Sequence, residues 1–202
     1  MSKKEHRHPW SWIPTLYFAE GIPYVIVMTV SVVMFKDLGV SNTDIALFTS
    51  WLYLPWVIKP LWSPIVDIVK TKRLWTVAMQ GLLAAGFIGV AFTLTLPIED
   101  FFWPSMIFLA LMALASATHD IAADGFYLLA LNKEEQSFFV GIRSTFYRAA
   151  TLFGNGVLVF FAGYFTKNYF ANDAEPAWMI VFGIAAGLFI IFSIYHKFML
   201  PY

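Results

Sequence analysis

The sequence predicts an all-α integral membrane protein with six transmembrane helices. Of its 202 residues, 59% are hydrophobic and only 13% are charged, whereas soluble domains carry about 25% charged residues. A helix that crosses a bilayer needs about 20 mainly apolar residues, and six such segments are separated by short polar connectors. They cover residues 12–35, 45–66, 74–96, 102–128, 138–165 and 177–199. Because these segments are long and do not alternate apolar with polar residues, helices are expected rather than strands.

The basic residues of the connectors predict that both termini are cytoplasmic, with residues 1–11 forming a cytoplasmic tail. In this orientation, basic residues concentrate on the inner side, as the positive-inside rule requires. The inner segments carry Lys3, Lys4, Arg7, Lys70, Lys72, Arg73, Lys133 and Lys197, and the outer connectors carry Lys36 and Lys167. The formal net charge is zero, so membrane lipids are the expected surroundings and no nucleic-acid partner is expected.

Ionisable residues occur inside four of the predicted spans, where they are rare and usually face a bundle interior or a water-filled cavity. These residues are Glu20, Lys59, His119, Asp120, Asp124, Arg143 and Arg148. Asp120 and Asp124 are four positions apart, so they share one face of the fourth helix. Lys59 and the two arginines are expected at a similar depth. The pattern therefore predicts a network of ion pairs between helices.

The network has two interpretations from the residues alone. It can simply hold the helices together, or it can form a pathway whose pairs exchange during a transport cycle. Glu20 is the better candidate for proton uptake, because a desolvated carboxylate without a nearby cation binds a proton more readily. Its own span contains no cation, and its helical neighbours are Tyr17 and Tyr24. Glu20 can equally serve as a structural hydrogen-bond acceptor.

Two further helix faces combine polar and aromatic residues. Trp56 and Lys59 share a face of the second span, which also contains three prolines. This pair can stack on a sugar or bind an anion, or it can be a packed aromatic beside a lysine that extends toward the membrane surface. Arg148 and Asn155 share a face of the fifth span. Arginine suits carboxylate and phosphate groups, so its partner is an anionic substrate or one of the aspartates.

No catalytic residue and no metal site is predicted. The sequence has no cysteine and no recognisable hydrolase or metalloprotease motif. Asp120 and Asp124 can in principle bind a divalent metal, as in membrane enzymes that act on diphosphates, but such a site needs more oxygen ligands. No second aspartate pair occurs in another span at similar depth. We therefore expect that the protein is not an enzyme, with a metal-dependent membrane transferase as the weaker alternative.

The connector "SPIVDIVKTKRLW" resembles a degenerate form of the signature G-x-x-x-D-R-x-G-R-R of the major facilitator superfamily. Asp67 matches the signature aspartate, and Lys72 and Arg73 match its distal basic pair. Ser63 replaces the first glycine, and Ile68 replaces the arginine after the aspartate. Six spans with a cytoplasmic N-terminus are similar to the N-terminal half of this family's twelve-helix fold.

Three segments resemble a narrower group, the AmpG-like muropeptide permeases and their acetyl-coenzyme A transporter relatives. The segments are "YFAEGIPY", "WVIKPLWSPIVD" and "SATHDIAADGF". The second is similar to the pattern K-x-L-W-S/A-P-x-x-D of that group, and the third to A-T-Q-D-I-x-x-D. Matching residues are Lys59, Trp62, Pro64, Asp67, Ala117, Thr118, Asp120, Ile121 and Asp124. His119 stands in place of the glutamine.

The resemblance implies proton-driven import of a muropeptide across the bacterial inner membrane, powered by the proton gradient without a cofactor. Another peptide, a sugar or an acyl-CoA-like solute is the alternative cargo. Such transporters consist of two six-helix halves, so the expected partner is a C-terminal half or a second half-subunit. A non-transporting membrane sensor or assembly partner is the competing function.

The predicted residue roles follow from both lines of reasoning. For proton coupling we expect Glu20, Asp120 and Asp124. For substrate contact or gating we expect Tyr24, Trp56, Lys59, His119, Arg143, Arg148 and Asn155. For the cytoplasmic gate we expect Asp67, Lys72 and Arg73.

Overall fold

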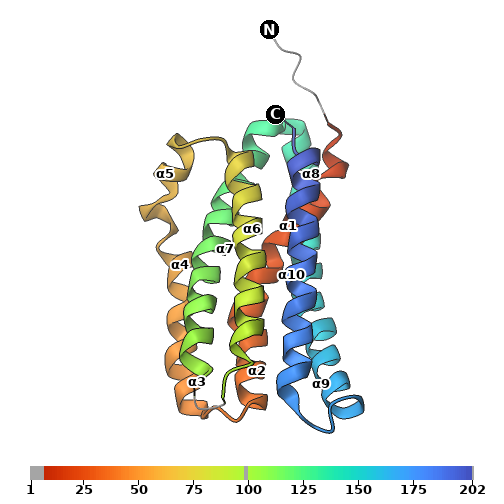
Figure 1. Ribbon diagram of the computed structural model, residues 1–202. Coiled ribbons are helices and arrows are strands. Elements are labelled where there is room, and N and C mark those ends of the chain that lie inside the picture. Colours follow the sequence, from red (N-terminus) through yellow and green to blue (C-terminus); the bar gives the residue numbers. More distant parts are fainter. Residues whose placement is uncertain (1–6, 98–99, 202) are drawn as a thin grey trace.

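The computed structural model describes residues 7–97 and 100–201, and all regular elements within these ranges are helical. The long helices run side by side in one bundle (Figure 1), which confirms the all-α prediction. The α-helices are α1 Ile13–Val25, α2 Ser31–Asp37, α3 Asn42–Thr49, α4 Leu54–Val57, α5 Ser63–Ile68, α6 Lys72–Thr93, α7 Phe102–Ala130, α8 Lys133–Leu152, α9 Val159–Asn168 and α10 Ala174–Met199.

Among the described residues, five continuous helical segments are long and apolar enough to cross a membrane. They are Pro9–Asp37, Lys72–Thr93, Phe102–Ala130, Lys133–Asn168 and Ala174–Met199. These segments correspond to the predicted spans 12–35, 74–96, 102–128, 138–165 and 177–199. Their ends differ from the predicted ones by a few residues, because polar capping residues extend the helices beyond the apolar windows.

The second predicted span, residues 45–66, is not one continuous helix. This stretch is divided into α3, α4, α5 and two short 3-10 segments, although it runs along the bundle as a span does (Figure 1). Pro55, Pro60 and Pro64 each lie in the first turn of one of the short helices. Proline has no backbone N–H to continue a preceding helix, but it is well accommodated in a first turn. Each proline therefore ends one helix and starts the next.

Two of the membrane-spanning segments contain a π-helical turn. Residues Ile26–Val30 separate α1 from α2, three positions after Pro23, and Phe153–Leu158 separate α8 from α9. The two turns pack against each other. A Cβ atom on Gly154 would lie 2.3 Å from Cγ1 of Val25, so glycine is needed for this close approach. Such turns are common at functional sites.

Side-chain caps determine where several helices begin. Thr71 accepts a hydrogen bond from the backbone N–H of Leu74 at the start of α6, and Asn132 and Glu135 form a reciprocal capping box at the start of α8. These bonds satisfy backbone donors that have no partner within the helix. The short connectors therefore reverse the chain at defined positions.

The packing of the bundle separates its helices into two groups. α6 packs mainly against α7 and α10, whereas α1 packs against α8 and α7. Phe87 of α6 and Phe189 of α10 are buried in the main core with ring centroids 5.2 Å apart. The outward faces of α6 and α10 instead expose large apolar side chains. These are Leu82, Ile88, Phe92, Ile184, Ile191 and Phe198. Such faces are compatible with lipid contact.

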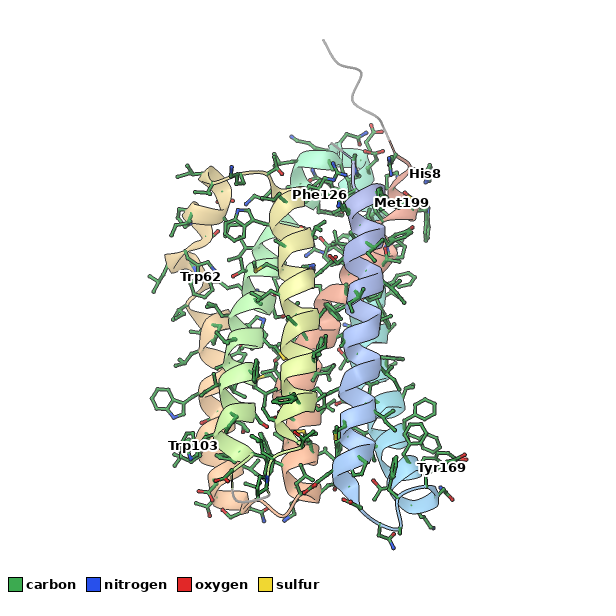
Figure 2. All side chains as sticks on the ribbon, viewed as in Figure 1. His8, Trp62, Trp103, Phe126, Tyr169 and Met199 are labelled. Carbon is green, nitrogen blue, oxygen red and sulfur yellow. The ribbon has the colours of Figure 1, made fainter. Side chains whose placement is uncertain are left out.

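The two ends of the bundle differ in charge. His8 and Met199 lie at the same end, which we call the terminal end, and Trp103 and Tyr169 lie toward the other (Figure 2). The segment between α5 and α6 is also at the terminal end (Figure 1). Basic residues are in excess at this end, which carries Arg7, Lys70, Lys72, Arg73, Lys133 and Lys197 beside Asp67, Glu134 and Glu135. Acidic residues are in excess at the opposite end, which carries Asp37, Asp44, Asp100, Asp173 and Glu175 beside Lys36 and Lys167.

We predict that Gly21→Ala destabilises the protein by about 1–3 kcal/mol, the usual cost of overpacking a core. The added Cβ atom would lie 2.8 Å from Cβ of Ala150 and 2.9 Å from the backbone oxygen of Tyr147, which cannot move independently of α8. Unfolding in detergent would measure the change. Gly183→Ala in α10 is the matched control, because its Cβ atom would meet nothing within 4 Å. Equal stability of the two variants would contradict the prediction.

Candidate functional site

An ion pair joins the broken second span to α7. Nζ of Lys59 lies 2.5 Å from Oδ2 of Asp120, and the two side chains are 28% and 11% exposed. Lys59 begins a short 3-10 turn directly after the end of α4. The interruption of the helix before Pro60 thus occurs at the residue that reaches α7. This pair agrees with the predicted network.

A second ion pair joins α7 to α8, one helical turn from the first. Nη2 of Arg143 lies 2.9 Å from Oδ1 of Asp124. The hydroxyl group of Tyr17 donates a hydrogen bond to the same oxygen over 3.1 Å. The guanidinium carbon of Arg143 also lies 4.7 Å from the ring centroid of Tyr17 and 5.1 Å from that of Tyr127. Cation–π contact therefore supports the ion pair, although the Asp124 side chain remains 47% exposed.

Glu20 of α1 lies in the electrostatic field of both ion pairs. It is 7% exposed, and its Oε2 atom has no hydrogen-bond partner among the described residues. The charges that act on it belong to both aspartates of α7 and to Arg143 and Lys59. A buried carboxylate oxygen without a donor is unfavourable. Glu20 is consequently the group in the site with an unused capacity to bind a proton or a donor group of a ligand.

Aromatic side chains link α1 to α4 near the first ion pair. The rings of Tyr24 and Trp56 meet edge to face with centroids 5.1 Å apart, and Trp56 stacks on Tyr53 at 6.5 Å. Tyr24 and Trp56 were predicted separately, and the structure brings them together. Their contact joins the two chain segments that carry Glu20 and Lys59.

Arg148 and Asn155 lie outside this network. Both side chains are exposed, on the segment formed by α8 and the π-helical turn that follows it. Arg148 has no ion-pair partner in residues 7–97 and 100–201. The two exposed residues Ser144 and Thr145 add further polar groups to this segment. An exposed arginine within a membrane span requires water or another protein surface rather than lipid.

His119 belongs to a separate buried hydrogen-bonded chain. Its Nε2 atom lies 3.0 Å from Nε2 of Gln80 in α6, and Oε1 of Gln80 lies 3.0 Å from Nδ1 of His196 in α10. His196 continues to Oγ1 of Thr15 in α1, also at 3.0 Å. His119, Gln80 and His196 are almost completely buried. This chain joins four spans, and it places His119 on a different face of α7 from Asp120.

The residues of the predicted signature loop divide between two contacts. Lys72 forms an ion pair with Asp67, and Arg73 donates a hydrogen bond to the backbone oxygen of Lys197 at the end of α10. Asp67 also lines a cavity of about 510 Å³ together with Lys59 and Asp124. The loop therefore borders the ion-pair site and is tied to the end of the last helix.

Within the described ranges, no three histidine, aspartate or glutamate side chains come together as a metal site would require. Asp120 and Asp124, which in principle could bind a metal, each pair with a basic side chain instead.

Comparison with protein families decides the broader assignment, because the model of the major facilitator superfamily matches residues 15–202. The chain belongs to the major facilitator superfamily. This membership explains the apolar bundle and points to a transporter rather than an enzyme.

Two fungal proteins are similar to this superfamily member. An uncharacterized membrane protein of Saccharomyces cerevisiae is 27% identical over 220 residues, which cover 89% of this chain and 37% of the yeast protein. An uncharacterized protein of Schizosaccharomyces pombe is 28% identical over 175 residues, which cover 78% of this chain and 33% of that protein. The chain thus spans about a third of the length of these curated relatives.

Three uncharged residues in these networks of the superfamily member had no role predicted from the sequence. Tyr17 and Tyr127 contact Arg143, and Gln80 binds two histidines. A signal for the tyrosines was present, since Tyr17 is three positions from Glu20 and Tyr127 three positions from Asp124. Gln80 lies near the middle of an otherwise apolar stretch of α6, which is also a recognisable signal.

We predict that Asp120→Asn destabilises the protein by about 3 kcal/mol, because it leaves the Lys59 ammonium group without its carboxylate. The double variant Lys59→Gln/Asp120→Asn should lose less stability, because both charges are removed and none is left unpaired. A double-mutant cycle of unfolding in detergent would measure this coupling, with Asp100→Asn, an exposed carboxylate at the other end, as the control. Strictly additive losses would show that the pair has no net interaction.

We also predict that Gln80→Met destabilises the protein by about 2 kcal/mol or more, because it leaves two buried imidazole nitrogens without partners. Thr76→Val on the same helix is the control, since among the described residues the hydroxyl group of Thr76 bonds only to the backbone oxygen of Lys72 one turn earlier. Thermal unfolding of both variants in one detergent would test this. A loss of stability in Thr76→Val as large as that in Gln80→Met would refute a special role for this hydrogen-bonded chain.

Proposed function

We propose that this chain is the N-terminal half of a proton-coupled secondary transporter. The observation that supports this most is the arrangement of two ion pairs on one helix beside a buried, unpaired carboxylate. Asp120 and Asp124 each bind a base from a different chain segment, and Glu20 lies within reach of their fields. An ion pair that breaks and forms again can couple helix movement to the binding of a charge.

Proton coupling is assigned to Glu20, Asp120 and Asp124. Protonation of Glu20 removes a negative charge from the surroundings of the two aspartates. Each aspartate then interacts differently with its base, and the contacts between α7 and its two neighbours change in strength. A proton that binds to Glu20 therefore changes the electrostatic environment of both ion pairs.

The cargo is an anionic or partly sugar-like solute. A muropeptide is the solute implied by the resemblance of three segments to AmpG-like permeases, and an acyl-CoA-like solute is the one implied by their acetyl-coenzyme A transporter relatives. Exposed Arg148 and Asn155 supply polar contacts, and the pair Tyr24 and Trp56 supplies a stacking surface. The names of the two fungal relatives state no substrate, so they favour neither solute.

The partner of this half is a second six-helix unit that covers the exposed polar face of α8. The longer relatives support this, since the chain spans about a third of their length. The terminal end is the cytoplasmic one, and the excess of basic side chains there supports this orientation. The bacterial inner membrane is the location that a muropeptide importer would require.

We predict that the complete gene gives uptake of labelled anhydromuropeptide in cells that lack their own permease, and that a protonophore abolishes it. The 202-residue chain alone should give none. Glu20→Gln and Asp120→Asn should reduce uptake by the complete protein to background, because neither variant side chain can take up a proton. Asp100→Asn should transport normally.

Uptake of labelled acetyl-CoA into proteoliposomes with an imposed pH gradient would separate the two solutes. Uptake of acetyl-CoA without uptake of muropeptide would change the assigned cargo to acetyl-CoA and leave the proposed proton-coupled mechanism unchanged. Normal flux in both acidic variants would remove the proton-coupling assignment. No gradient-dependent flux of either solute by well-expressed, membrane-inserted protein would favour a non-transporting sensor.

A further inference from the structure

A large pocket lies at the terminal end, next to the ion-pair site. Its volume is about 1180 Å³, and it is bordered by the beginning of α6, the ends of α7 and α10, and the segment that precedes α1. Phe126, Met199 and His8 mark this region in Figure 2. Lys59, Asp120 and Arg143 do not line it. The pocket thus adjoins the ion-pair site without including its ion pairs: Asp67 borders both, and Lys72 and Arg73 of the predicted cytoplasmic gate also line the pocket.

The charge of the pocket is strongly positive. Its lining includes one carboxylate, that of Asp67, and five basic side chains: Arg7, Lys70, Lys72, Arg73 and Lys197. Asp67 is already paired with Lys72. Lys70 and Lys197 are exposed, and neither forms an ion pair within the described residues. An anion in the pocket would bind these two lysines without first breaking an ion pair.

The backbone at the rim adds one feature that suits an anion. α6 begins at Lys72, and the N-terminus of a long helix carries a partial positive charge. Lys70 has a φ angle of 62°, in the left-handed region that a lysine rarely adopts. The indole N–H of Trp75 donates a hydrogen bond to the backbone oxygen of Val69, which helps to hold this short connector in place.

The walls of the pocket are mainly apolar, and several of their side chains are exposed. Leu74 of α6, Leu129 of α7, and Ile194 and Phe198 of α10 all line it with exposed side chains. They continue the outward apolar faces of α6 and α10 described above. A basic mouth above apolar helix faces matches the shape of a phospholipid, with an anionic phosphate and hydrocarbon chains.

We propose that this pocket binds an anionic phospholipid. The phosphate group lies between Lys70 and Lys197, and the acyl chains extend along α6 and α10. Basic pockets between transmembrane helices on the cytoplasmic side bind such head groups. The phosphate chemistry alone would also suit a small soluble phosphate, but such a ligand has no use for the apolar walls. This distinction separates the two sources experimentally.

Native mass spectrometry of the detergent-solubilised protein would test the proposal by measuring the affinities for dioleoylphosphatidylglycerol and dioleoylphosphatidylcholine. The protein should prefer the anionic lipid. Lys70→Gln/Lys197→Gln should weaken its binding by about fivefold for each lysine, or about 25-fold in total, as expected for basic residues near an anionic membrane. Lys133→Gln/Lys167→Gln makes the same charge change at exposed lysines outside the pocket and should have little effect.

Two results would overturn the proposal. One is an equal loss of affinity in the pocket variant and in the control variant, which would show attraction to overall charge rather than a site. The other is competition by glycerol 3-phosphate at the concentration at which the lipid itself binds, which would assign the pocket to a soluble phosphate. Retained helical circular dichroism in both variants would show that the comparison is made between folded proteins.

Discussion

The structure depends on the pairing of two carboxylates within one apolar helix. Asp120 and Asp124 lie one turn apart on α7, and charges at this depth require partners. Their bases come from different neighbours, Lys59 from the broken second span and Arg143 from α8. The positions of three chain segments are thus linked through α7. Among the described residues, Glu20 is the one acid near these pairs without a base of its own. The charge of the site can therefore change through protonation of Glu20.

The sequence predicted the spans well where apolar length alone determines a helix. Five of six predicted segments are continuous helices, because hydropathy measures transfer into lipid and lipid favours a closed helical backbone. The second predicted span, residues 45–66, is divided into short helices, and hydropathy alone cannot show this because it does not register backbone donors. The stretch around Pro55, Pro60 and Pro64 is apolar enough to enter a membrane, but it lacks the N–H groups that a continuous helix needs.

The partner of each charged residue in the site was harder to predict than the helix face on which that residue lies. The spacing of Asp120 and Asp124 correctly indicated a shared face, but not which base each would bind, because that depends on how neighbouring helices are rotated. The role predicted for His119 stays a prediction. Adjacent residues on a helix point about 100° apart, so His119 faces Gln80 while Asp120 faces Lys59. A search for charged groups alone overlooks an amide such as Gln80.

The proline-divided second span gives the two ion pairs different mechanical roles. Arg143 is part of a 20-residue helix, whose hydrogen bonds form one cooperative unit. Lys59 is part of a three-residue turn, and segments with few continuous hydrogen bonds open locally at low free energy. Release of Lys59 from Asp120 therefore frees a short length of chain, whereas release of Arg143 from Asp124 leaves Arg143 on an intact helix. The Lys59–Asp120 pair can thus open through a local movement of the divided second span, whereas the Arg143–Asp124 pair connects two continuous helices, α7 and α8.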